Sequence, residues 1–336
     1  MLDFNDKKIS GSAIKLNSAD NVAVALSEIK AGTNLLGTNI TTREIVPPGY
    51  KVAICDISQG DPIKKYEVTV GFAKSDIVAG TMLHNHNIEF REFDRDYAYA
   101  KHYKPVEKFP EDSRATFQGY KRADGRAGTR NFISIVSTVN CSATVVHAIA
   151  DHFNEERLSQ YPNVDGVAAF SHNTGCGMEL TGEPMNLLHR TLAGYIKHPN
   201  VAGSLVVGLG CERCQVGGLF ETQKLQPDQT LRTLVMQEAG GTRQTISRGI
   251  SIIEELLEIA NQSKRETVST SHIMVGLQCG GSDSFSSITA NPSLGNAIDI
   301  LSKHGGTGIL SETPEIYGVE HTLTAVSYTH LRAHET

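Results

Sequence analysis

The stretch Phe132-Ile-Ser-Ile-Val-Ser-Thr-Val139, followed at once by Asn140-Cys141-Ser142, decides the fold of the second part of the chain. An apolar run of this length with polar neighbours predicts a buried strand. Residues 142–156 follow with apolar side chains at helical spacing, so the strand leads into a helix. Alternation of strand and helix is typical of a parallel sheet that is covered on both faces.

The same rhythm continues along the chain. We expect further strands at 164–170, 201–208, 231–236 and 272–277, and helices at 184–196, 246–260 and 293–302. The sequence therefore predicts an α/β region with a parallel sheet over residues 119–324.

Cysteines follow the expected strands. Four strands run into Gly- or Ser-rich loops that each carry one: Cys141, Cys176, Cys211 and Cys279. The carboxyl ends of parallel strands line the ligand crevice of open α/β sheets, and Gly-rich loops there expose N–H groups that suit carboxylates. We expect the four thiols on one functional rim. The alternative is that cysteine serves as a small apolar residue in tight turns. The Cys211-Glu-Arg-Cys214 spacing also leaves a redox pair or half a zinc site open.

The first 97 residues have a different pattern. Short apolar runs alternate with turns such as Lys30-Ala-Gly-Thr33, Val46-Pro-Pro-Gly-Tyr50 and Ile77-Val-Ala-Gly-Thr81. Turn residues at such short spacing predict a compact all-β module with repeated hairpins. Residues 98–118 are polar and contain two prolines, which predicts a linker.

The β module ends in His84-Asn-His86. On a strand, side chains two residues apart point to the same face, where two imidazoles can share one metal ion. The alternative is an exposed loop without a function. We treat His84 and His86 as candidate metal ligands.

Composition excludes several classes of protein. The 336 residues include 31 Lys and Arg against 37 Asp and Glu, a net charge of −6 that does not favour coating nucleic acid. No apolar run approaches the ~18 residues of a membrane span. The polar start is unlike a secretory signal, and six cysteines then indicate reduced thiols. We expect a cytoplasmic protein without nucleic-acid or membrane partners.

Two further segments carry candidate groups. The basic, Gly-rich loop 119–131 contains Arg126, Arg130 and Asn131, which can bind a carboxylate or can form a solvated loop. The segment 311–321 is acidic and includes Glu312. Its acids are either functional groups or the first turn of a helix.

The motifs together resemble the altronate/galactarate dehydratase family. The matching stretches lie within residues 15–324 and include GTMLHNHNI, DGRAGTRNFISIVSTVNCSATV, VDGVAAFSHNTGCGM, VVGLGCE, GLQCGGSDSFSS and ETPEIYGVEH. The resemblance implies a SAF domain with a β-clip fold at 1–97 and a Rossmann-like α/β region at 119–324. It also implies loss of water from a sugar acid, D-altronate giving 2-dehydro-3-deoxy-D-gluconate, with a divalent metal, Fe²⁺ or Mn²⁺.

Residue roles follow from this reaction as hypotheses. A base removes the proton α to the carboxylate, a cation stabilises the enediolate, and the β-hydroxyl leaves. We expect His172 as the base with Cys141 and Cys176 as further catalytic groups, and a metal at His84 and His86. The expected substrate-binding residues are Arg126, Arg130, Asn131, Asn140, Ser142 and Glu312.

Other functions stay open. Galactarate dehydratase and sulfolactate sulfo-lyase share parts of these motifs. An iron–sulfur or redox protein that uses the rim cysteines is a different class, as is a sugar-acid binder without chemistry. Family members continue past ETPEIYGVEH, whereas residues 325–336 match nothing in the family. We therefore expect a truncated chain with uncovered apolar faces and a non-native tail that includes His330 and His334. A homodimer is also expected.

Overall fold

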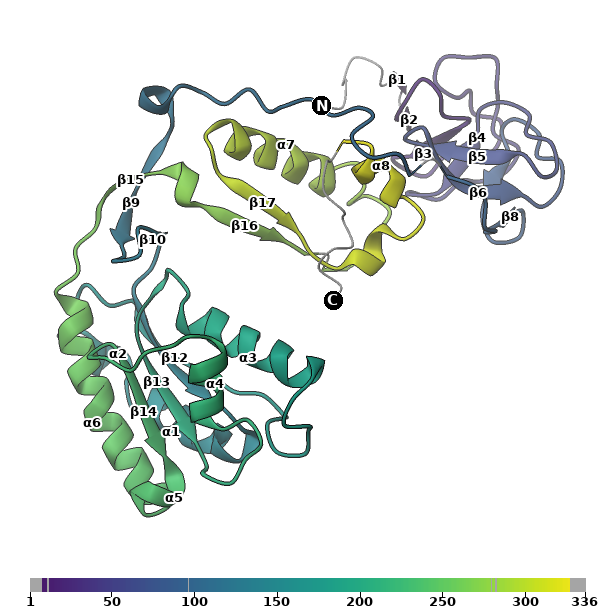
Figure 1. Cartoon of the computed structure of the whole chain (residues 1–336). Helices are drawn as coiled ribbons and strands as arrows, with labels where there is room; N and C mark the ends of the chain where they lie inside the picture. The colour runs from purple at the N-terminus through teal and green to yellow at the C-terminus, as the bar shows by residue number, and fades with distance from the viewer. Residues whose placement is uncertain (1–7, 11, 96, 279, 282, 327–336) are drawn as a thin grey trace. The chain divides into compact units, whose positions relative to one another are not determined.

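The computed structural model describes residues 8–10, 12–95, 97–278, 280–281 and 283–326 (Figure 1). It divides into two compact units, and each is described by itself. Unit 1 holds residues 1–108, 274–303 and 307–336, and unit 2 holds residues 109–273 and 304–306. In the part of the chain that is described, no helix combines the length and the apolarity needed to cross a bilayer.

The beginning of unit 1 is rich in antiparallel strands, as the sequence predicts. Its larger sheet has the order β1-β2-β3-β4-β7 and its smaller sheet the order β5-β6-β8. The larger sheet consists of β1 (Lys8–Ser10), β2 (Ala13–Lys15), β3 (Val22–Ala25), β4 (Lys51–Ala53) and β7 (Met82–Leu83). The smaller sheet consists of β5 (Pro62–Lys65), β6 (Val68–Ala73) and β8 (Ile88–Glu89).

Glycines make the turns between these strands. Gly32, Gly49 and Gly80 stand in the three repeated turn phrases, and all have left-handed φ angles, of +77°, +82° and +87°. An added Cβ at Gly80 would collide with the carbonyl oxygen of Thr41, so this turn has no room for a side chain. The turn chemistry read from the sequence therefore matches the folded backbone.

Unit 2 contains a four-stranded parallel sheet in the order β12-β11-β13-β14. Its strands are β11 (Phe132–Ser137), β12 (Gly166–Phe170), β13 (Val201–Gly208) and β14 (Leu231–Val235). These are the first four strands that the sequence predicts for this region. The prediction of a parallel sheet with intervening helices is confirmed here.

Helices cover both faces of this sheet (Figure 1). On one face Ile133 and Ile135 of β11 pack with α1 (Ala143–Asp151) and α6 (Thr242–Asn261). On the other face Val136 packs with α3 (Glu183–Ile196) and α4 (Val216–Thr222). Because successive side chains of β11 point to opposite faces of the sheet, this strand contributes to two hydrophobic cores. Two short helices complete the region, α2 (Glu155–Leu158) and α5 (Met236–Ala239).

A small antiparallel sheet of unit 2 is not among the sequence predictions. It has the order β10-β9-β15, with β9 (Thr116–Lys121), β10 (Ala127–Gly128) and β15 (Glu266–Ser269). β9 begins inside the segment 98–118 that was expected to be a linker, after a 3₁₀ turn, η2 (Glu111–Ser113). Its half-polar sequence lacks the apolar run on which the strand predictions depend.

The strand before Cys279 does not belong to the four-stranded sheet, which corrects one prediction. β16 (Met274–Leu277) pairs in parallel with β17 (Thr307–Leu310), and α7 (Ala290–Lys303) connects them. Cys279 itself lies outside the described residues. The expected rim of four cysteines is therefore wrong in its fourth strand. The described part of the chain also contains the short elements η3 (Asn140–Ser142), η4 (Thr270–His272), η5 (Thr313–Ile316) and α8 (Glu320–Thr324).

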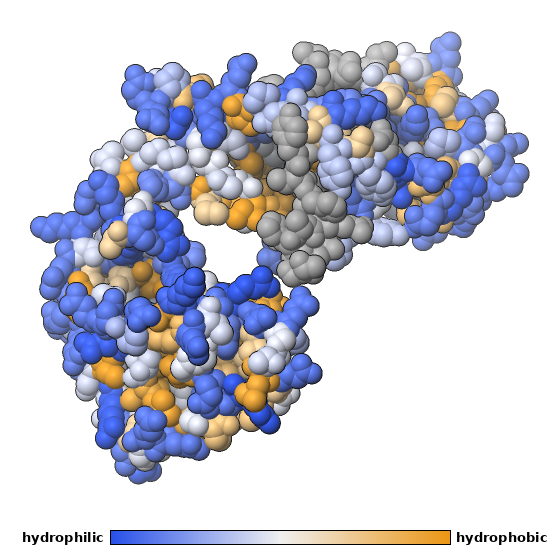
Figure 2. Space-filling model, in the orientation of Figure 1, coloured by the Kyte–Doolittle hydropathy of each residue, from blue (hydrophilic) through white to orange (hydrophobic). Residues whose placement is uncertain are grey.

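Large apolar side chains are exposed around this strand pair. Met274 is 66% exposed, Leu310 60% and Ile300 of α7 50%. Figure 2 shows hydrophobic residues at the surface in this part of unit 1. His330, His334 and the rest of 327–336 lie outside the described residues.

Candidate functional site

The candidate site lies at the carboxyl ends of β11 and β13. From β11 the chain passes through α1 on one face of the sheet to β12, and from β12 through α3 on the other face to β13. The loop after β11 thus leads to α1 on one face, and the loop after the neighbouring strand β13 leads to α4 on the other face, so these two loops diverge. A point where strand order reverses in this way is the usual position of a ligand crevice in an open α/β sheet.

Main-chain hydrogen bonds hold the three rim loops together. The amide of Asn140 donates to the carbonyl of Thr174 at 3.0 Å, and the amide of Arg213 donates to the carbonyl of Gly175 at 2.9 Å. Gly175 has a φ of +97°, and an added Cβ would collide with the Thr138 carbonyl oxygen. Only glycine therefore lets the loop after β12 approach the end of β11 this closely.

A buried carboxylate fixes the loop after β13. Glu212 is 3% exposed. Its side chain accepts hydrogen bonds from the Thr138 hydroxyl at 2.9 Å and from the amides of Leu209 at 3.1 Å and Gly210 at 2.6 Å. Hydrogen bonds to a buried charged group are among the stronger ones in proteins. Glu212 thereby sets the direction in which the next residue, Arg213, leaves the loop.

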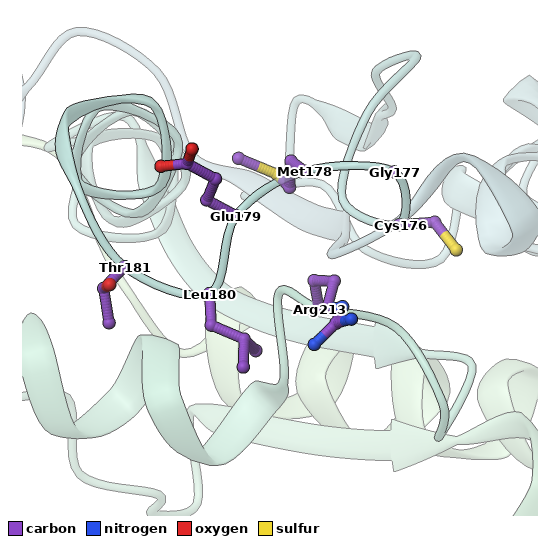
Figure 3. Close-up of a pocket in the computed structure, with 7 residues that line it drawn as sticks. All are labelled: Cys176, Gly177, Met178, Glu179, Leu180, Thr181 and Arg213. Atoms are coloured by element: carbon purple, nitrogen blue, oxygen red, sulfur yellow. The ribbon is translucent and has the colours of Figure 1, made fainter.

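An open pocket of about 700 Å³ lies beside this loop and includes Cys176, Glu179, Leu180 and Arg213 in its lining. Figure 3 shows the segment 176–181 curving around the Arg213 side chain, with Cys176 on one side and Leu180 on the other. Among the described residues, the Arg213 guanidinium makes no ion pair or side-chain hydrogen bond. Its five N–H donors are therefore available to a carboxylate.

Thiols lie on the same rim. Cys141 after β11, Cys176 after β12 and Cys211 after β13 are all exposed, as the sequence predicts for strand ends. Cys214 is different, because it is buried in the core beside α4. Burial, with a further contribution from Glu212, raises the pKa of the Cys214 thiol to about 12. Cys214 is thus a small core residue rather than a reactive partner of Cys211.

His172 is engaged within its own loop. Nδ1 accepts a hydrogen bond from the Thr174 amide at 3.2 Å, which leaves the proton on Nε2, 3.1 Å from the carbonyl of Ser137. Burial lowers the pKa of His172, and the bond to Ser137 partly opposes this shift. Both nitrogens of the neutral ring therefore have partners, and neither is free to accept a substrate proton in this conformation.

Arg126 and Arg130 lie at the opposite end of the sheet from the rim. Both precede β11, a six-residue strand, so roughly 20 Å of strand separates them from Cys141. Arg126 pairs with Asp124 at 2.6 Å and Arg130 with Asp165 at 3.1 Å. The sequence placed these arginines and the rim cysteines in one site, and the structure does not bring them together.

Two other predicted substrate-binding residues are completely buried. The Asn131 amide donates to the carbonyls of Asn163 at 2.7 Å and Ala260 at 3.0 Å, and its oxygen accepts from Arg122 at 3.0 Å. The Ser142 hydroxyl is 3.0 Å from the carbonyls of Val139 and Val207. These side chains stabilise loops and have no surface in contact with a pocket. Asn140, in contrast, is exposed on the rim.

His84 and His86 lie in unit 1, in the turn between β7 and β8 and not on a strand, so the argument from strand alternation does not apply. The Asn87 side chain closes this turn by accepting from the His84 amide at 2.9 Å. The His84 ring stacks on Tyr50 with 5.3 Å between ring centres. Among the described residues, no three His, Cys, Asp or Glu side chains form a group that could hold a metal ion.

Glu312 also lies in unit 1, directly before η5. Its backbone has a left-handed φ of +61°, a conformation that costs a non-glycine residue about 1 kcal/mol or more. Its carboxylate accepts a hydrogen bond from Gln278 at 3.1 Å. Glu312 therefore connects the segments that follow β16 and β17.

The sequence reasoning missed Arg213, Glu212 and Thr138. Arg213 and Glu212 lie inside Cys211-Glu-Arg-Cys214, a motif from which only the two cysteines were predicted to have a function. An acid next to a base directly after a strand was a usable signal, because the strand end predicts a place on the rim. Nothing in the sequence indicated that Glu212 would turn inward to Thr138, which is 74 residues earlier in the chain.

Comparison with known protein families gives three consecutive matches. Residues 11–91 match the altronate/galactarate dehydratase SAF domain. Residues 119–261 match the second domain of D-galactarate dehydratase/altronate hydrolase, and residues 270–335 match the C-terminal domain of D-galactarate/altronate dehydratase. The order of the matches is the order of the strand-rich module, the parallel sheet and the β16–β17 region.

Individual relatives agree with these matches. The chain is 36% identical over 313 residues to altronate dehydratase of Escherichia coli (strain K12) and 34% identical over 315 residues to altronate dehydratase of Bacillus subtilis (strain 168). It is 34% identical over 319 residues to galactarate dehydratase (L-threo-forming) of E. coli (strain K12). The alignments cover 92–93% of this chain but span only 61–62% of the relatives. With a SAF domain followed by matches to two further domains of the same proteins, the chain belongs to the altronate/galactarate dehydratase family.

Proposed function

We propose that this protein is a hydro-lyase that removes water from a sugar acid, with D-altronate as substrate and 2-dehydro-3-deoxy-D-gluconate as product. The observation that carries the proposal is the rim pocket of unit 2, which is lined by the exposed Cys176 thiol and by the Arg213 guanidinium, a group without an ion pair among the described residues. The relatives named altronate dehydratase supply the substrate class. D-galactarate is the alternative substrate, because one relative of similar identity is named for it.

Arg213 is proposed to bind the substrate carboxylate. When the proton α to that carboxylate is removed, negative charge builds up on its oxygens as an enediolate forms. A guanidinium that binds both oxygens stabilises this charge more than the charge of the ground state, and so lowers the barrier. Arg126 and Arg130 are not proposed to bind the substrate, because each is paired with an aspartate at the far end of β11.

Cys176 is proposed as the group that accepts the α-proton, in the role first expected for His172. A thiolate can serve as a general base, and Cys176 is exposed in the Arg213 pocket. His172 is then a positioning residue that braces the 171–176 loop through Ser137 and Thr174. Loss of the β-hydroxyl, with one proton, completes the release of water, and the enol product becomes the ketone.

A divalent metal, Fe²⁺ with Mn²⁺ as the alternative, is part of the proposal. His84 and His86 supply imidazole nitrogens, a donor type that suits both metals. Since the described residues offer no third ligand beside them, the remaining ligands are proposed to come from outside the described part of this chain. When bound, a divalent metal would supply Lewis-acid chemistry.

Several broader features belong to the same proposal. We infer a β-clip fold for the SAF domain and a Rossmann-like fold for the parallel-sheet region. We also infer a cytoplasmic homodimer whose partner is a small sugar acid rather than a nucleic acid or a membrane. The domain limits 1–97, 98–118 and 119–324 and a role of Cys141, Asn140 or Glu312 at the substrate stay predictions. The match to the C-terminal domain runs to residue 335, through the tail that was expected to match nothing in the family.

The test is to incubate the purified chain with Fe²⁺ or Mn²⁺ and with D-altronate, D-galactarate or sulfolactate, and to follow formation of a 2-keto acid. We expect turnover with D-altronate, and a loss of about 10²–10⁴-fold in kcat for Cys176→Ser. Cys55→Ser is the matched control, because Cys55 is an exposed thiol of unit 1. No turnover with any substrate would refute the proposal, and acid-labile sulfide in the active protein would favour an iron–sulfur enzyme instead.

A further inference from the structure

The rim pocket of unit 2 has a charge of each sign in its lining. Among the described residues that line it, Arg213 is the only one with a positive charge and Glu179 the only one with a negative charge. Figure 3 shows the Glu179 carboxylate turned away from the Arg213 guanidinium. The two groups therefore do not neutralise each other, and each acts on a ligand separately.

The Glu179 carboxylate lies at the N-terminus of α3, a helix of 14 residues. Its Oε2 atom is 3.3 Å from the position that a Cβ would take on Gly182, the residue directly before the helix. Figure 3 shows the carboxylate beside this helix, which follows Thr181. Because Gly182 has no side chain that could cap α3, the N–H groups of the first turn keep their partial positive charge. Glu179 thus places a negative charge where the helix attracts one.

Contacts of the neighbouring residue fix the course of the chain at Glu179. Met178 packs against the apolar core that contains Met185 of α3 and Leu219 of α4. Its sulfur accepts a hydrogen bond from the Thr174 hydroxyl at 3.4 Å, and its amide donates to the carbonyl of Cys176 at 3.0 Å. With Met178 anchored in this way, the segment 176–181 has a defined path around the pocket before any ligand arrives.

Two features of this rim attract anions, the guanidinium of Arg213 and the N-terminus of α3. A helix N-terminus is a common place for the carboxylate or phosphate of a ligand. Here the chain supplies the negative charge itself, through Glu179. Among the described groups that line the pocket, this leaves the Arg213 guanidinium for the carboxylate of a ligand.

The two candidate substrates differ in the number of their carboxylates. Altronate has a carboxylate at C1 and an alcohol at C6, whereas galactarate has a carboxylate at both ends. With C1 bound to Arg213, the hydroxyl groups of altronate can donate hydrogen bonds to a carboxylate of the pocket. The second carboxylate of galactarate would instead be repelled by Glu179, because the pocket, of about 700 Å³, is comparable in width with the screening length of about 8 Å in physiological salt.

We propose that Glu179 is a specificity-determining residue that restricts the rim pocket to sugar acids with a single carboxylate. The choice of ligands and the role of Arg213 rest on the proposed function. D-altronate offers its carboxylate to Arg213 and only hydroxyl groups to Glu179, whereas D-galactarate leaves one carboxylate facing a like charge. Glu179 acts on binding and takes no part in the proton transfers.

Calorimetric titration of the whole chain with D-altronate and with D-galactarate tests this inference apart from catalysis. In the parent protein we expect altronate to bind about fivefold more tightly than galactarate, and this preference should shrink in high salt. Glu179→Gln removes the charge and offers an amide that can donate to a carboxylate. We expect it to tighten galactarate binding about fivefold and to leave altronate binding within about twofold. Glu179→Lys should reverse the preference.

Glu183→Gln is the matched control, because Glu183 is an exposed acid in the first turn of the same helix and does not line the pocket. It should leave the ratio of the two affinities unchanged. A role of Glu179 that is confined to stabilising α3 would change the thermal unfolding of the variants but not this ratio. Glu179 is itself exposed, so Glu179→Gln and Glu179→Lys are expected to fold.

Three results would overturn the inference: an unchanged affinity ratio in Glu179→Gln, a parent protein that binds galactarate as tightly as altronate, or no binding of either acid. If Arg213→Gln binds both acids as the parent does, the pocket is not their site, and the role of Arg213 in the proposed function fails as well. A chain whose binding depends on Arg213 and whose preference depends on Glu179, but which forms no 2-keto acid, retains this inference and loses only the enzymatic function.

Discussion

The carboxylate of Glu212 accepts a hydrogen bond from the hydroxyl of Thr138 at 2.9 Å and is almost completely buried while doing so. This bond joins the end of β11 to the loop after β13, at the point where the order of the parallel strands reverses. Because Arg213 is the next residue along the chain, the position of its guanidinium depends on this buried contact. The buried hydrogen bond between Thr138 and Glu212 thus organises the rim.

Removing the charge of Glu212 should destabilise unit 2 and disturb the rim. In Glu212→Gln the new amide NH₂ faces the main-chain donor of Gly210 in one orientation, and the main-chain donor of Leu209 and the Thr138 hydroxyl in the other. Because a donor then faces a donor in either case, we expect a loss of about 1.5–3 kcal/mol in the free energy of unfolding. Urea denaturation measures this loss. Glu238→Gln, at an exposed position, is the control and should change stability by about 0.5 kcal/mol or less. Equal effects of the two substitutions would show that the Glu212 contact is unimportant.

Arg213 should matter for turnover, and the two arginines before β11 should not. Loss of a charged hydrogen bond to substrate of about 1.5–3 kcal/mol corresponds to a fall of roughly 10–100-fold in kcat/KM for Arg213→Gln. Arg126→Gln and Arg130→Gln remove pairs with Asp124 and Asp165 that are partly exposed, and Arg126→Gln also removes an exposed hydrogen bond to the carbonyl of Lys197. We expect these two variants to stay within about threefold of the parent, since such pairs contribute about 1 kcal/mol or less. A loss in Arg130→Gln as large as that in Arg213→Gln would restore the site that the sequence predicted.

Alkylation should distinguish the rim thiols from the core thiol. Cys141, Cys176 and Cys211 are exposed, whereas burial and Glu212 raise the pKa of Cys214 to about 12. At pH 8 nearly all of Cys214 would therefore be the unreactive thiol. Peptide mass mapping after brief treatment with iodoacetamide should therefore find label on the three rim cysteines and none on Cys214. Rapid labelling of Cys214 in the folded protein would contradict its place in the core.

Unit 2 should lose stability as the pH falls below neutrality. His189 is 5% exposed, its Nδ1 lies 2.8 Å from the Thr222 hydroxyl, and burial lowers its pKa. Near pH 6.5 this histidine therefore binds a proton in the unfolded chain but not in the folded one. The contribution of His189 to stability is fully present above about pH 6.5. Below that pH it falls by at most ~1.4 kcal/mol per pH unit.

The variant His189→Gln tests the sign of this effect, because it keeps a polar contact to Thr222 and cannot be protonated. Its free energy of unfolding, measured in urea at pH 7 and pH 5, should change less between the two values than that of the parent. Burial also lowers the pKa values of His172 and His198, so part of the acid sensitivity will persist. A larger pH dependence in His189→Gln than in the parent would disprove the assignment.

The sequence predicted what depends on local patterns. The apolar runs of β11 to β14 and the Gly turns of the SAF domain carry their structure in a few neighbouring residues, and both are found where they were expected. The place of Cys141, Cys176 and Cys211 on one rim followed from topology alone. Strand β9 was missed because its pairing with β15 spans about 150 residues, from Gln118 to Thr267, and leaves no local signal.

The errors in the site have the same origin. Arg130 and Cys141 are close in sequence, but the strand between them separates them in space. Asn131 and Ser142 are polar residues that looked available, yet each is used to bind main-chain groups in the interior. Whether a polar side chain turns inward depends on which carbonyls or amides the folded chain leaves unpaired, and that depends on contacts distant in sequence.

Removal of the metal gives the sharpest test of the two histidines of the SAF domain. The chain is loaded with Fe²⁺ without oxygen, freed of excess metal and assayed for bound metal and for dehydration. We expect His84→Ala combined with His86→Ala to lower the metal content and the rate together, since loss of a ligand weakens metal binding directly. His102→Ala is the control, because His102 is exposed in the segment before β9. Treatment with a chelator should reproduce the effect in the parent protein, and added Fe²⁺ should reverse it there but not in the double variant. If the double variant kept full metal content and rate, the metal would be held by other residues and the stacking of His84 on Tyr50 would have only a structural role.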